Sequence, residues 1–511
     1  MRNLQVSNHF RLPKPSNLPS RTIYLFAFKV KILFVSPEVS PFARTGGLGD
    51  VVGSLPIELK RLGIDVRILC PMYESCKKLP TNRHSGKINI GDLKKSHQAS
   101  VLESQIGETN VPLYLVENNF LFARDGIYSD ASGDFQDNVQ RAFALCRAAL
   151  KLSEIVDWEP EVFHTHDWMA APLSPLLNAS PRIKNKPRKH SVLTIHNLEH
   201  QGKGTYDDFK QSGLPNDYWG SSFDYFGSMN LLKGGIQHAD KITTVSPTYA
   251  DEIKSEAYGC GLENILNYRA ADLIGILNGM DEKLWDPQND SLLPTPIDPT
   301  KPSVGKKTCK LALQKEMNLP LDSEVPVFGV VSRLCRQKGL DLLIKALPEL
   351  MDKTTAQFIV LGSGDSEEES AFRLLSQKFQ DRIASHIGFD DGLARRIFGG
   401  SDFFLMPSRF EPCGLAQQYS MRYGSIPIAR KTGGLADTIH SFISHEKSSN
   451  GFLFEGDDHE DFKSVIYLAL KVFKDRKTLN MIQANAFHSS CSWKKAAKEY
   501  AKVYQWAMGK N

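Results

Sequence analysis

The sequence predicts an α/β protein of two doubly wound parallel-sheet domains that face a central cleft. The chain has 511 residues, too many for one compact core, and a prior of roughly 150 residues per domain indicates two or three domains. Short apolar runs alternate with segments of helical period, the pattern of βαβ units. The alternation stops in residues 286–302, which are rich in Pro, Asp and Asn, and starts again at residue 325. Two sheets joined by a hinge leave a cleft, the usual place for a small ligand.

The composition argues against nucleic acid or membrane as a partner. A net charge of +4 is too small to bind a polyanion, and no apolar run reaches the ~18 residues that a bilayer span needs. The eight cysteines include no C-x-x-C pair. This usage indicates reduced thiols in a cytoplasmic compartment rather than a disulfide framework or a zinc site.

The expected domain limits follow from these changes in pattern. Residues 1–29 carry no acid and are interpreted as a disordered leader; the alternative is a transit peptide, which would place the protein in a plastid. Residues 30–275 are expected to form the N-terminal domain and residues 276–488 the C-terminal domain. Residues 489–511 are expected to form a last helix that packs back on the N-terminal domain.

The N-terminal domain opens with a βαβ unit. Residues 30–35 are apolar and β-branched and predict a strand, and Val51, Leu55, Leu59 and Leu62 then fall on one face of a helix that Gly63 ends. The same reasoning predicts a helix over residues 139–152 and strands over residues 65–69, 111–116, 162–164, 191–195 and 241–245.

The C-terminal domain repeats the alternation. It is expected to contain strands over residues 325–331, 358–361 and 403–406, helices over residues 340–350 and 416–423, and the last helix over residues 493–508. Pro407 should end its strand, and Pro412 and Gly414 should form a tight turn before the next helix.

That turn contains the first candidate site residue, Glu411. A strand that turns into a helix N-terminus leaves free N–H groups that suit phosphate or hydroxyl oxygens. A lone glutamate in a loop would ordinarily be a surface residue. Here a second glycine turn, residues 431–435 (KTGGL), follows about one strand later and favours a ligand site.

Two turns combine a cation with glycines. Residues 44–50 (RTGGLGD) and 431–437 (KTGGLAD) share this pattern, and glycines let a backbone approach an anion closely. A lone Gly-Gly pair would be a plain turn, but Gly46 and Gly47 follow the first strand at its carboxyl end, where such sheets bind ligands.

A basic loop follows the first strand of the second domain. Residues 332–339 (SRLCRQKG) place Arg333 and Lys338 where both can reach one diphosphate. A solvated basic loop is the alternative, and the strand-loop-helix context favours phosphate.

Histidines end two strands of the first domain. Residues 164–168 (HTHDW) could hold a metal ion, which makes a metal hydrolase the rival hypothesis, but the sequence supplies no clear third ligand. We favour His166 as a hydrogen-bonding site residue, and His196 has the same strand-end placement. Asp137 precedes a helix, where capping and ligand contact both remain open. Cations and glycines for a diphosphate, with acids and histidine for hydroxyls, together indicate a nucleotide-sugar whose leaving group needs no metal.

These motifs together resemble those of bacterial and plant-type glycogen and starch synthases, which are retaining glucosyltransferases with two Rossmann-like domains (the GT-B fold). The resemblance runs from about Val30 to the C-terminus. It is carried by residues 41–50, 164–168, 194–197, 276–281, 331–334, 337–339, 407–415 and 432–437. It implies transfer of glucose from ADP-glucose to the non-reducing end of an α-1,4-glucan, with no metal and no other cofactor. From the residues themselves, ADP-glucose and UDP-glucose both remain open.

The resemblance also implies roles for individual residues. Arg333 and Lys338 would hold the diphosphate, Glu411 would contact the glucose hydroxyls, and His166 would bind near the 6-hydroxyl. The residues expected to bind substrate are Arg44, Gly46, Gly47, Asp137, His196, Asn278, Cys413, Gly414, Leu415, Thr432 and Gly433. The alternative of the same fold is a catalytically weak glucan-binding or priming protein.

Two positions depart from the family pattern. Arg44 stands where lysine is usual, which keeps the charge but replaces a point charge with a planar fork. Ala416 stands where a hydroxyl residue is frequent, which removes one hydrogen bond to the ligand.

Overall fold

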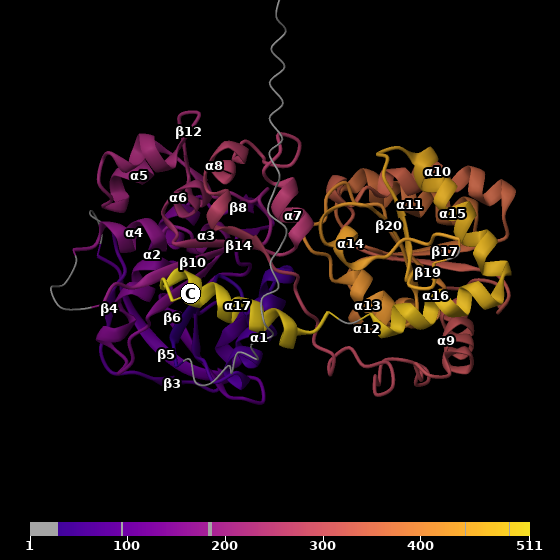
Figure 1. Ribbon diagram of the computed structural model, residues 1–511, viewed down its shortest axis with the longest axis horizontal. Coiled ribbons are helices and arrows are strands. Elements are labelled where there is room, and N and C mark those ends of the chain that lie inside the picture. The colour runs from indigo at the N-terminus through magenta and orange to yellow at the C-terminus, as the bar shows by residue number, and fades with distance from the viewer. Residues whose placement is uncertain (1–28, 93–95, 182–186, 445, 490, 511) are drawn as a thin grey trace, which may run out of the picture.

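The computed structural model describes residues 29–92, 96–181, 187–444, 446–489 and 491–510. It has two α/β domains side by side, with the chain crossing between them twice (Figure 1). The interpretation of residues 1–29 as a leader therefore lies, except for Lys29, outside the described residues.

The N-terminal domain is built on a sheet whose central part is parallel. Its strands lie in the order β15-β14-β10-β9-β1-β2-β6, and the chain order reverses between β1 and β9. The parallel strands are β1 (Lys31–Val35), β2 (Asp65–Pro71), β6 (Val111–Glu117), β9 (Val162–His166), β10 (His190–Ile195), β14 (Lys241–Thr244) and β15 (Leu273–Gly275). The antiparallel strand β5 (Gln98–Ile106) extends the sheet beyond β6 and pairs with β3 (Asn82–Arg83) and β4 (Ile88–Asn89).

Helices cover this sheet. They are α1 (Gly47–Arg61), α2 (Asn138–Lys151), α3 (Asp167–Ala170), α4 (Leu173–Ala179), α5 (Tyr206–Ser212), α6 (Leu231–His238), α7 (Pro247–Glu252) and α8 (Glu263–Tyr268). Short elements in the loops are η1 (Glu74–Lys78), β7 (Ser129–Asp130), β8 (Gly133–Asp134), η2 (Leu152–Glu154), β11 (Lys203–Gly204), η3 (Trp219–Phe223), β12 (Asp224–Tyr225), β13 (Ser228–Asn230) and η4 (Ala270–Asp272).

The C-terminal domain is built on a parallel sheet in the order β18-β17-β16-β19-β20-β21, which reverses between β16 and β19. Its strands are β16 (Val327–Val331), β17 (Gln357–Gly362), β18 (Ile383–Ile387), β19 (Phe403–Met406), β20 (Ile426–Arg430) and β21 (Phe452–Phe454). Its helices are α9 (Pro302–Glu316), η5 (Arg336–Lys338), α10 (Leu340–Lys353), α11 (Ser366–Lys378), α12 (Asp391–Gly400), α13 (Ala416–Arg422), α14 (Gly433–Thr438), α15 (His459–Lys474) and α16 (Arg476–His488).

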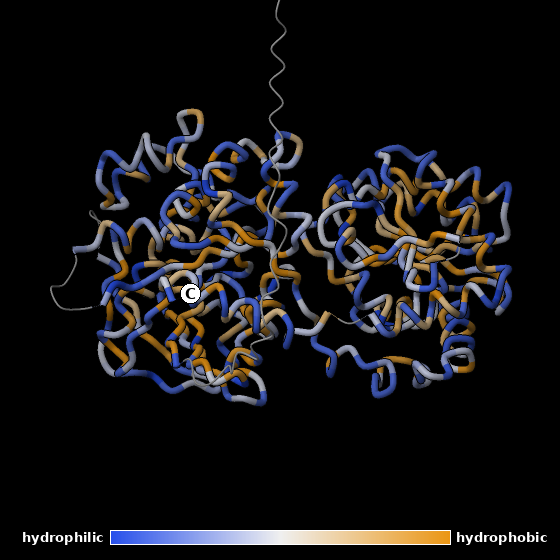
Figure 2. Tube along the Cα trace, in the orientation of Figure 1, coloured by the Kyte–Doolittle hydropathy of each residue, from blue (hydrophilic) through white to orange (hydrophobic). Residues whose placement is uncertain are grey.

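The strands of both sheets are apolar because helices cover both faces. In the C-terminal domain the ring of Phe328 stacks between those of Phe358 and Phe403, with centroids 4.8 and 5.1 Å away. Figure 2 shows the hydrophobic segments gathered inside each domain and the hydrophilic segments around them. The predicted fold class of two doubly wound parallel sheets is confirmed.

The last helix, α17 (Trp493–Ala507), returns to the N-terminal domain and packs against α1 (Figure 1). Its buried residues recur at helical spacing, and Tyr500 and Tyr504 belong to the same core as β1 and α1. The Tyr504 hydroxyl lies 2.9 Å from Nδ1 of His164, the middle residue of β9.

The two crossings between the domains lie side by side. The Met280 amide donates to the Cys491 carbonyl at 2.9 Å, and Met280 forms a parallel bridge with Ser492. The two interdomain segments are therefore paired with each other through backbone contacts. No helix among the described residues is both long enough and apolar enough to cross a membrane.

Candidate active site

The loops at the two reversal points of strand order face each other across the domain boundary. A Cβ atom added to Gly47, which follows β1, would lie 3.8 Å from Leu415 Cδ1, which follows β19. Cys413 packs into a core cluster made otherwise of residues before Asn278, among them Leu193 and Tyr249. Ligands of doubly wound sheets bind where the strand order reverses, so both binding edges open on the same space.

A cavity of ≈ 190 Å³ lies at the reversal point of the C-terminal sheet. Arg333 and Lys338 reach it from the loop after β16, and Ser408 reaches it from the loop after β19. Ala416, at the first turn of α13, also lines it. The structure thus brings both predicted phosphate cations to one cavity.

Glu411 is bound by two residues that line this cavity, Lys338 and Ser408. Lys338 Nζ lies 2.6 Å and Ser408 Oγ 2.9 Å from the same carboxylate oxygen, and Glu411 is only 6% exposed. β19 ends at Met406, directly before Pro407, and Gly414 has φ +67 in the turn before α13. The left-handed backbone at position 414 favours glycine and lets the chain reverse around Glu411.

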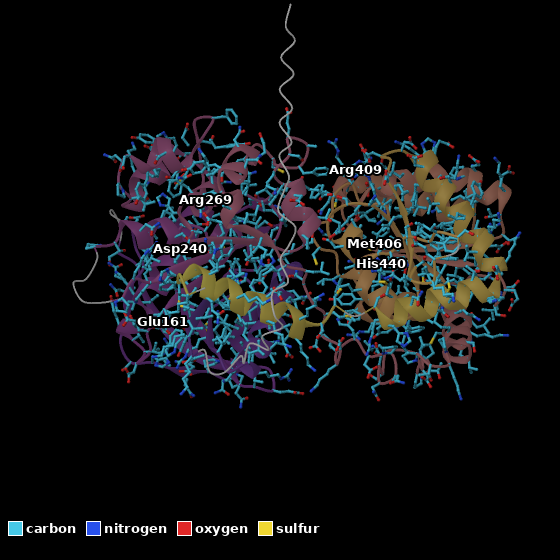
Figure 3. The ribbon with its side chains drawn as sticks, viewed as in Figure 1. Glu161, Asp240, Arg269, Met406, Arg409 and His440 are labelled. Carbon is cyan, nitrogen blue, oxygen red and sulfur yellow. The ribbon has the colours of Figure 1, made fainter. Side chains whose placement is uncertain are left out.

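The two loops around the cavity are joined to each other. The Arg409 amide donates to the Gln337 carbonyl at 2.9 Å, and Gln337 Nε2 donates to the Phe410 carbonyl at 3.3 Å. The Arg409 guanidinium forms a forked ion pair with Asp341, at 2.6 and 2.9 Å; Figure 3 labels Arg409 and Met406 in this domain. Arg333 donates to Gln337 Oε1 at 3.0 Å. The cations and Glu411 therefore stand on one rigid unit.

Glu38, which the sequence reasoning missed, organises the first glycine turn. Its carboxylate accepts from the Thr45 amide and hydroxyl at 2.7 and 2.9 Å, from the Gly46 amide at 3.3 Å and from the Tyr128 hydroxyl at 2.8 Å. The turn was expected to offer bare amides to a ligand, but the Gly46 amide is paired with Glu38. The available signal in the sequence was an acidic residue three positions after the first predicted strand, close to the binding edge of the sheet.

Arg44 lies beside this turn and pairs with Asp50. The Arg44 guanidinium donates to the Asp50 carboxylate at 3.0 Å, and its side chain is 40% exposed. The cation is therefore free to turn toward a ligand at small cost, because exposed ion pairs contribute little.

His166 and His196 form a buried pair at the ends of β9 and β10. His166 Nδ1 lies 3.0 Å from His196 Nε2, and the His196 amide donates to Asp167 Oδ1 at 2.6 Å. Burial lowers the pKa of His166 well below its usual range and that of His196 to about 3, so both rings are neutral. No described residue forms a hydrogen bond with His166 Nε2, which is buried.

Asp167, which follows His166 and accepts from the His196 amide, has a strained backbone. It has φ +54, a conformation that non-glycine residues adopt at a cost of about 1–3 kcal/mol. Burial raises the pKa of its carboxyl group to about 8. Strain that persists in a core usually marks a place where function needs one geometry.

His164, the other half of the H-x-H motif, points elsewhere. Its ring nitrogens are taken by the Tyr504 hydroxyl and by the Thr194 hydroxyl, the latter at 2.6 Å. Among the described residues, no group of three histidines, cysteines or acids is placed to hold a metal ion. These pairings disfavour the rival metal hydrolase, because His164 has no free nitrogen to ligate.

Asp137 and Asn278, two further residues expected to bind substrate, lie before α2 and beside the interdomain crossing. Asp137 precedes α2 but does not cap it; its carboxylate accepts from the Arg124 guanidinium at 2.7 Å. Asn278 lies next to the interdomain crossing, and its carbonyl accepts from Gln418 Nε2 at 3.3 Å. Asn278 Oδ1 is buried, with no hydrogen-bond partner among the described residues.

The second glycine turn is occupied by a glutamate of the other domain. The Thr432 hydroxyl and the Gly433 amide donate to Glu252 Oε1 at 2.8 and 3.0 Å. Both donors were expected to face a ligand, and in this structure they face Glu252, a residue that sequence reasoning missed.

Two doubly wound sheets, whose binding loops meet at the domain boundary beside a cavity lined by two cations, are the architecture of a glycosyltransferase of the GT-B fold. Residues 31–268 match the starch synthase catalytic domain, and residues 314–488 match glycosyl transferases group 1. The chain belongs to the glycogen and starch synthase family.

Individual relatives support this assignment. Glycogen synthase 2 of Geobacter sulfurreducens is 39% identical, over 94% of this chain and 99% of the relative. Glycogen synthase of Desulforudis audaxviator is 40% identical, over 95% and 98%. The solved catalytic domain of starch synthase IV from Arabidopsis thaliana, bound to ADP and acarbose, is 30% identical with a TM-score of 0.86, covering 94% of this chain and 100% of that one. Sucrose-phosphate synthase from Thermosynechococcus elongatus (TM-score 0.58, 16% identity) shares the fold.

Proposed function

We propose that this enzyme transfers glucose from ADP-glucose to the non-reducing end of an α-1,4-glucan, glycogen or starch, with retention of configuration. The observation that carries the proposal is the meeting of Arg333 and Lys338 at one cavity, where Lys338 also holds the carboxylate of Glu411. The related starch synthase was solved with ADP and acarbose, which supports an adenine nucleotide and a glucan-like ligand. Its cytoplasmic location remains a prediction.

Arg333 and Lys338 make the largest contribution to stabilising the transition state. As the bond between the glucose anomeric carbon and the phosphate oxygen breaks, negative charge builds up on the leaving diphosphate. Lys338 contributes a point charge and Arg333 a forked one, and both are positioned before the reaction starts. No metal ion or other cofactor takes part in this proposal.

Glu411 and His166 act on the sugar. Glu411, held by Lys338 and Ser408, accepts hydrogen bonds from glucose hydroxyls and places its negative charge near the oxocarbenium-like centre. His166, neutral because it is buried, offers Nε2 to the 6-hydroxyl. We expect Asp137 to contact the same sugar, and Arg44 and Gly47 to approach the phosphates from the N-terminal domain.

Leu415, Gly414 and Cys413 shape the loop that presents Glu411 rather than supplying charge. Cys413 is buried against the N-terminal domain, and burial raises the pKa of its thiol far above its usual range, so it remains uncharged. Asn278 and His196 support the site from the hinge and from behind His166.

Glucosyl transfer from ADP-glucose to glycogen tests the proposal. We expect Lys338→Ala and Glu411→Ala to lower kcat at least about 100-fold, because each removes charge placed for the transition state. Lys315→Ala, which removes an exposed lysine on α9, is the matched control and should keep wild-type activity. Full activity of either site variant would overturn the assigned roles. Preference for UDP-glucose in a competition assay would overturn the assigned donor.

A further inference from the structure

Helices α7 and α14, from different domains, are joined by four hydrogen bonds. The Thr248 amide and hydroxyl donate to Asp437 at 3.0 and 2.7 Å. In the opposite direction, Glu252 Oε1 accepts from Thr432 and Gly433. Figure 1 shows the two helices facing each other at the boundary. We call this set, Thr248, Glu252, Thr432, Gly433 and Asp437, the clasp.

The clasp lies directly against the backbone of the Glu411 loop. The Gly434 amide donates to the Glu411 carbonyl at 3.0 Å. A Cβ atom added to Gly433, whose φ is +44, would lie 2.0 Å from that same carbonyl oxygen, and one added to Gly434 would lie 2.0 Å from the Cys413 oxygen. The two backbones are in such close contact that a shift of the 432–434 turn must move Glu411.

Glu252 is therefore the link through which the N-terminal domain holds this loop. Both donors converge on one of its oxygens, Oε1, while Oε2 is buried without a hydrogen-bond partner among the described residues. Burial raises the pKa of Glu252, and the bonds from Gly433 and Thr432 lower it. A glutamine could accept the same two bonds through its amide oxygen, so the contact depends on the acceptor more than on the charge.

We propose that Glu252 is a positioning residue that fixes the Glu411 loop to the N-terminal domain, so that the domain arrangement sets the geometry of catalysis. The inference rests on the proposed function, in which Glu411 contacts the sugar. Glu252 does not touch the substrate in this scheme. It acts through Thr432, Gly433 and Gly434, and misplacement of a reacting group by about 1 Å can cost 100-fold in rate.

The test compares Glu252→Ala with Glu252→Gln and with Glu256→Ala, which removes an exposed acid of the next turn. For Glu252→Ala we expect kcat to fall about 10- to 100-fold while the KM for ADP-glucose stays within about twofold, because the phosphate cations are untouched. Glu252→Gln should recover most of kcat, and Glu256→Ala should equal wild type. A merely structural role would lower the melting temperature without this separation of kcat from KM.

Thr432→Val provides a second variant of the same contact, should Glu252→Ala fail to fold. It should lower kcat by less than Glu252→Ala does, because the Gly433 bond to Glu252 remains. The double variant should lose little more than Glu252→Ala alone, because both substitutions act on the same contact. Wild-type kcat in Glu252→Ala with an inactive Glu411→Ala would refute this inference and leave the proposed function standing. An active Glu411→Ala would refute the proposed function itself. Equal losses in Glu252→Gln and Glu252→Ala would also overturn the inference.

Discussion

Lys338 Nζ lies 2.6 Å from Glu411 Oε2, and the two residues come from loops on opposite sides of the strand-order reversal. Glu411 is buried and Lys338 nearly so, which makes the pair more strongly coupled than an ion pair in water. One cation therefore serves both a fixed carboxylate and the phosphate proposed to bind beside it.

Because Glu411 and the phosphate share Lys338, Glu411→Gln should strengthen the binding of ADP but lower the rate of glucosyl transfer. Without the carboxylate, Lys338 is free to pair with phosphate, so ADP should bind about 3- to 10-fold more tightly, or ~1 kcal/mol. The rate should fall about 100-fold because the charge near the sugar is lost. Calorimetry with ADP and the transfer assay measure both quantities. Unchanged ADP affinity would contradict the shared-cation interpretation.

The histidine pair predicts that His196 acts by holding His166. His196→Leu should lower kcat about 10-fold or more, because His166 loses the partner of Nδ1 and its ring can turn. His196→Gln keeps a polar group at that nitrogen and should recover part of the loss. The exposed His200 provides the control variant His200→Ala. Equal kcat in His196→Leu and wild type would show that the pair is dispensable.

The same buried histidines predict that stability falls in acid. The folded pKa of His196 is about 3 against 6.5 in the unfolded chain, so between these values the unfolded state binds the extra proton. This contribution to stability is complete above pH 6.5 and is lost as pH falls toward 3, at about 1.4 kcal/mol per unit. His164 and His166 act in the same direction. Asp167, whose folded pKa is about 8, acts in the opposite one.

Urea unfolding of wild type and His196→Gln between pH 7.5 and 5 isolates the contribution of His196 to the pH dependence of stability. The difference in unfolding free energy between the two proteins should shrink or change sign as pH falls, because the variant has no histidine to protonate on unfolding at that position. A difference independent of pH would mean that His196 is not buried and neutral.

The four hydrogen bonds of Glu38 predict that the loss of stability at the first glycine turn grows with the number of bonds removed. Glu38→Ala removes four hydrogen bonds and should cost about 2–4 kcal/mol of stability and raise the KM for ADP-glucose, since the turn loses its anchor. Tyr128→Phe removes only one of the four and should cost about 1 kcal/mol. Denaturant unfolding and steady-state kinetics measure both. Equal losses of stability in Glu38→Ala and Tyr128→Phe would show that the remaining three hydrogen bonds of Glu38 do not stabilise the turn.

Much of the site's composition could be predicted because its motifs are local. Arg333 and Lys338 are five residues apart on a loop whose strand-loop-helix context is visible in the sequence, and Glu411 lies in a turn marked by Pro412 and Gly414. What the sequence did not reveal is the pairing of the donors. In this structure the Gly46, Thr432 and Gly433 donors are bonded to Glu38 and Glu252, and their binding of substrate stays a prediction.

The alternation of strands and helices, the two-domain fold and the family can all be predicted from the amino-acid sequence. Apolar periodicity and turn residues act over a few positions, and each of the family's motifs is a short continuous segment. The contacts of Glu252 with Thr432 and of His196 with His166 are visible only in the folded chain. Each of these contacts joins segments distant along the chain, and only the order of strands and the packing of the domains bring them within hydrogen-bonding distance. Local propensity contains no information about such distances, whereas burial requires that each polar group find a partner there.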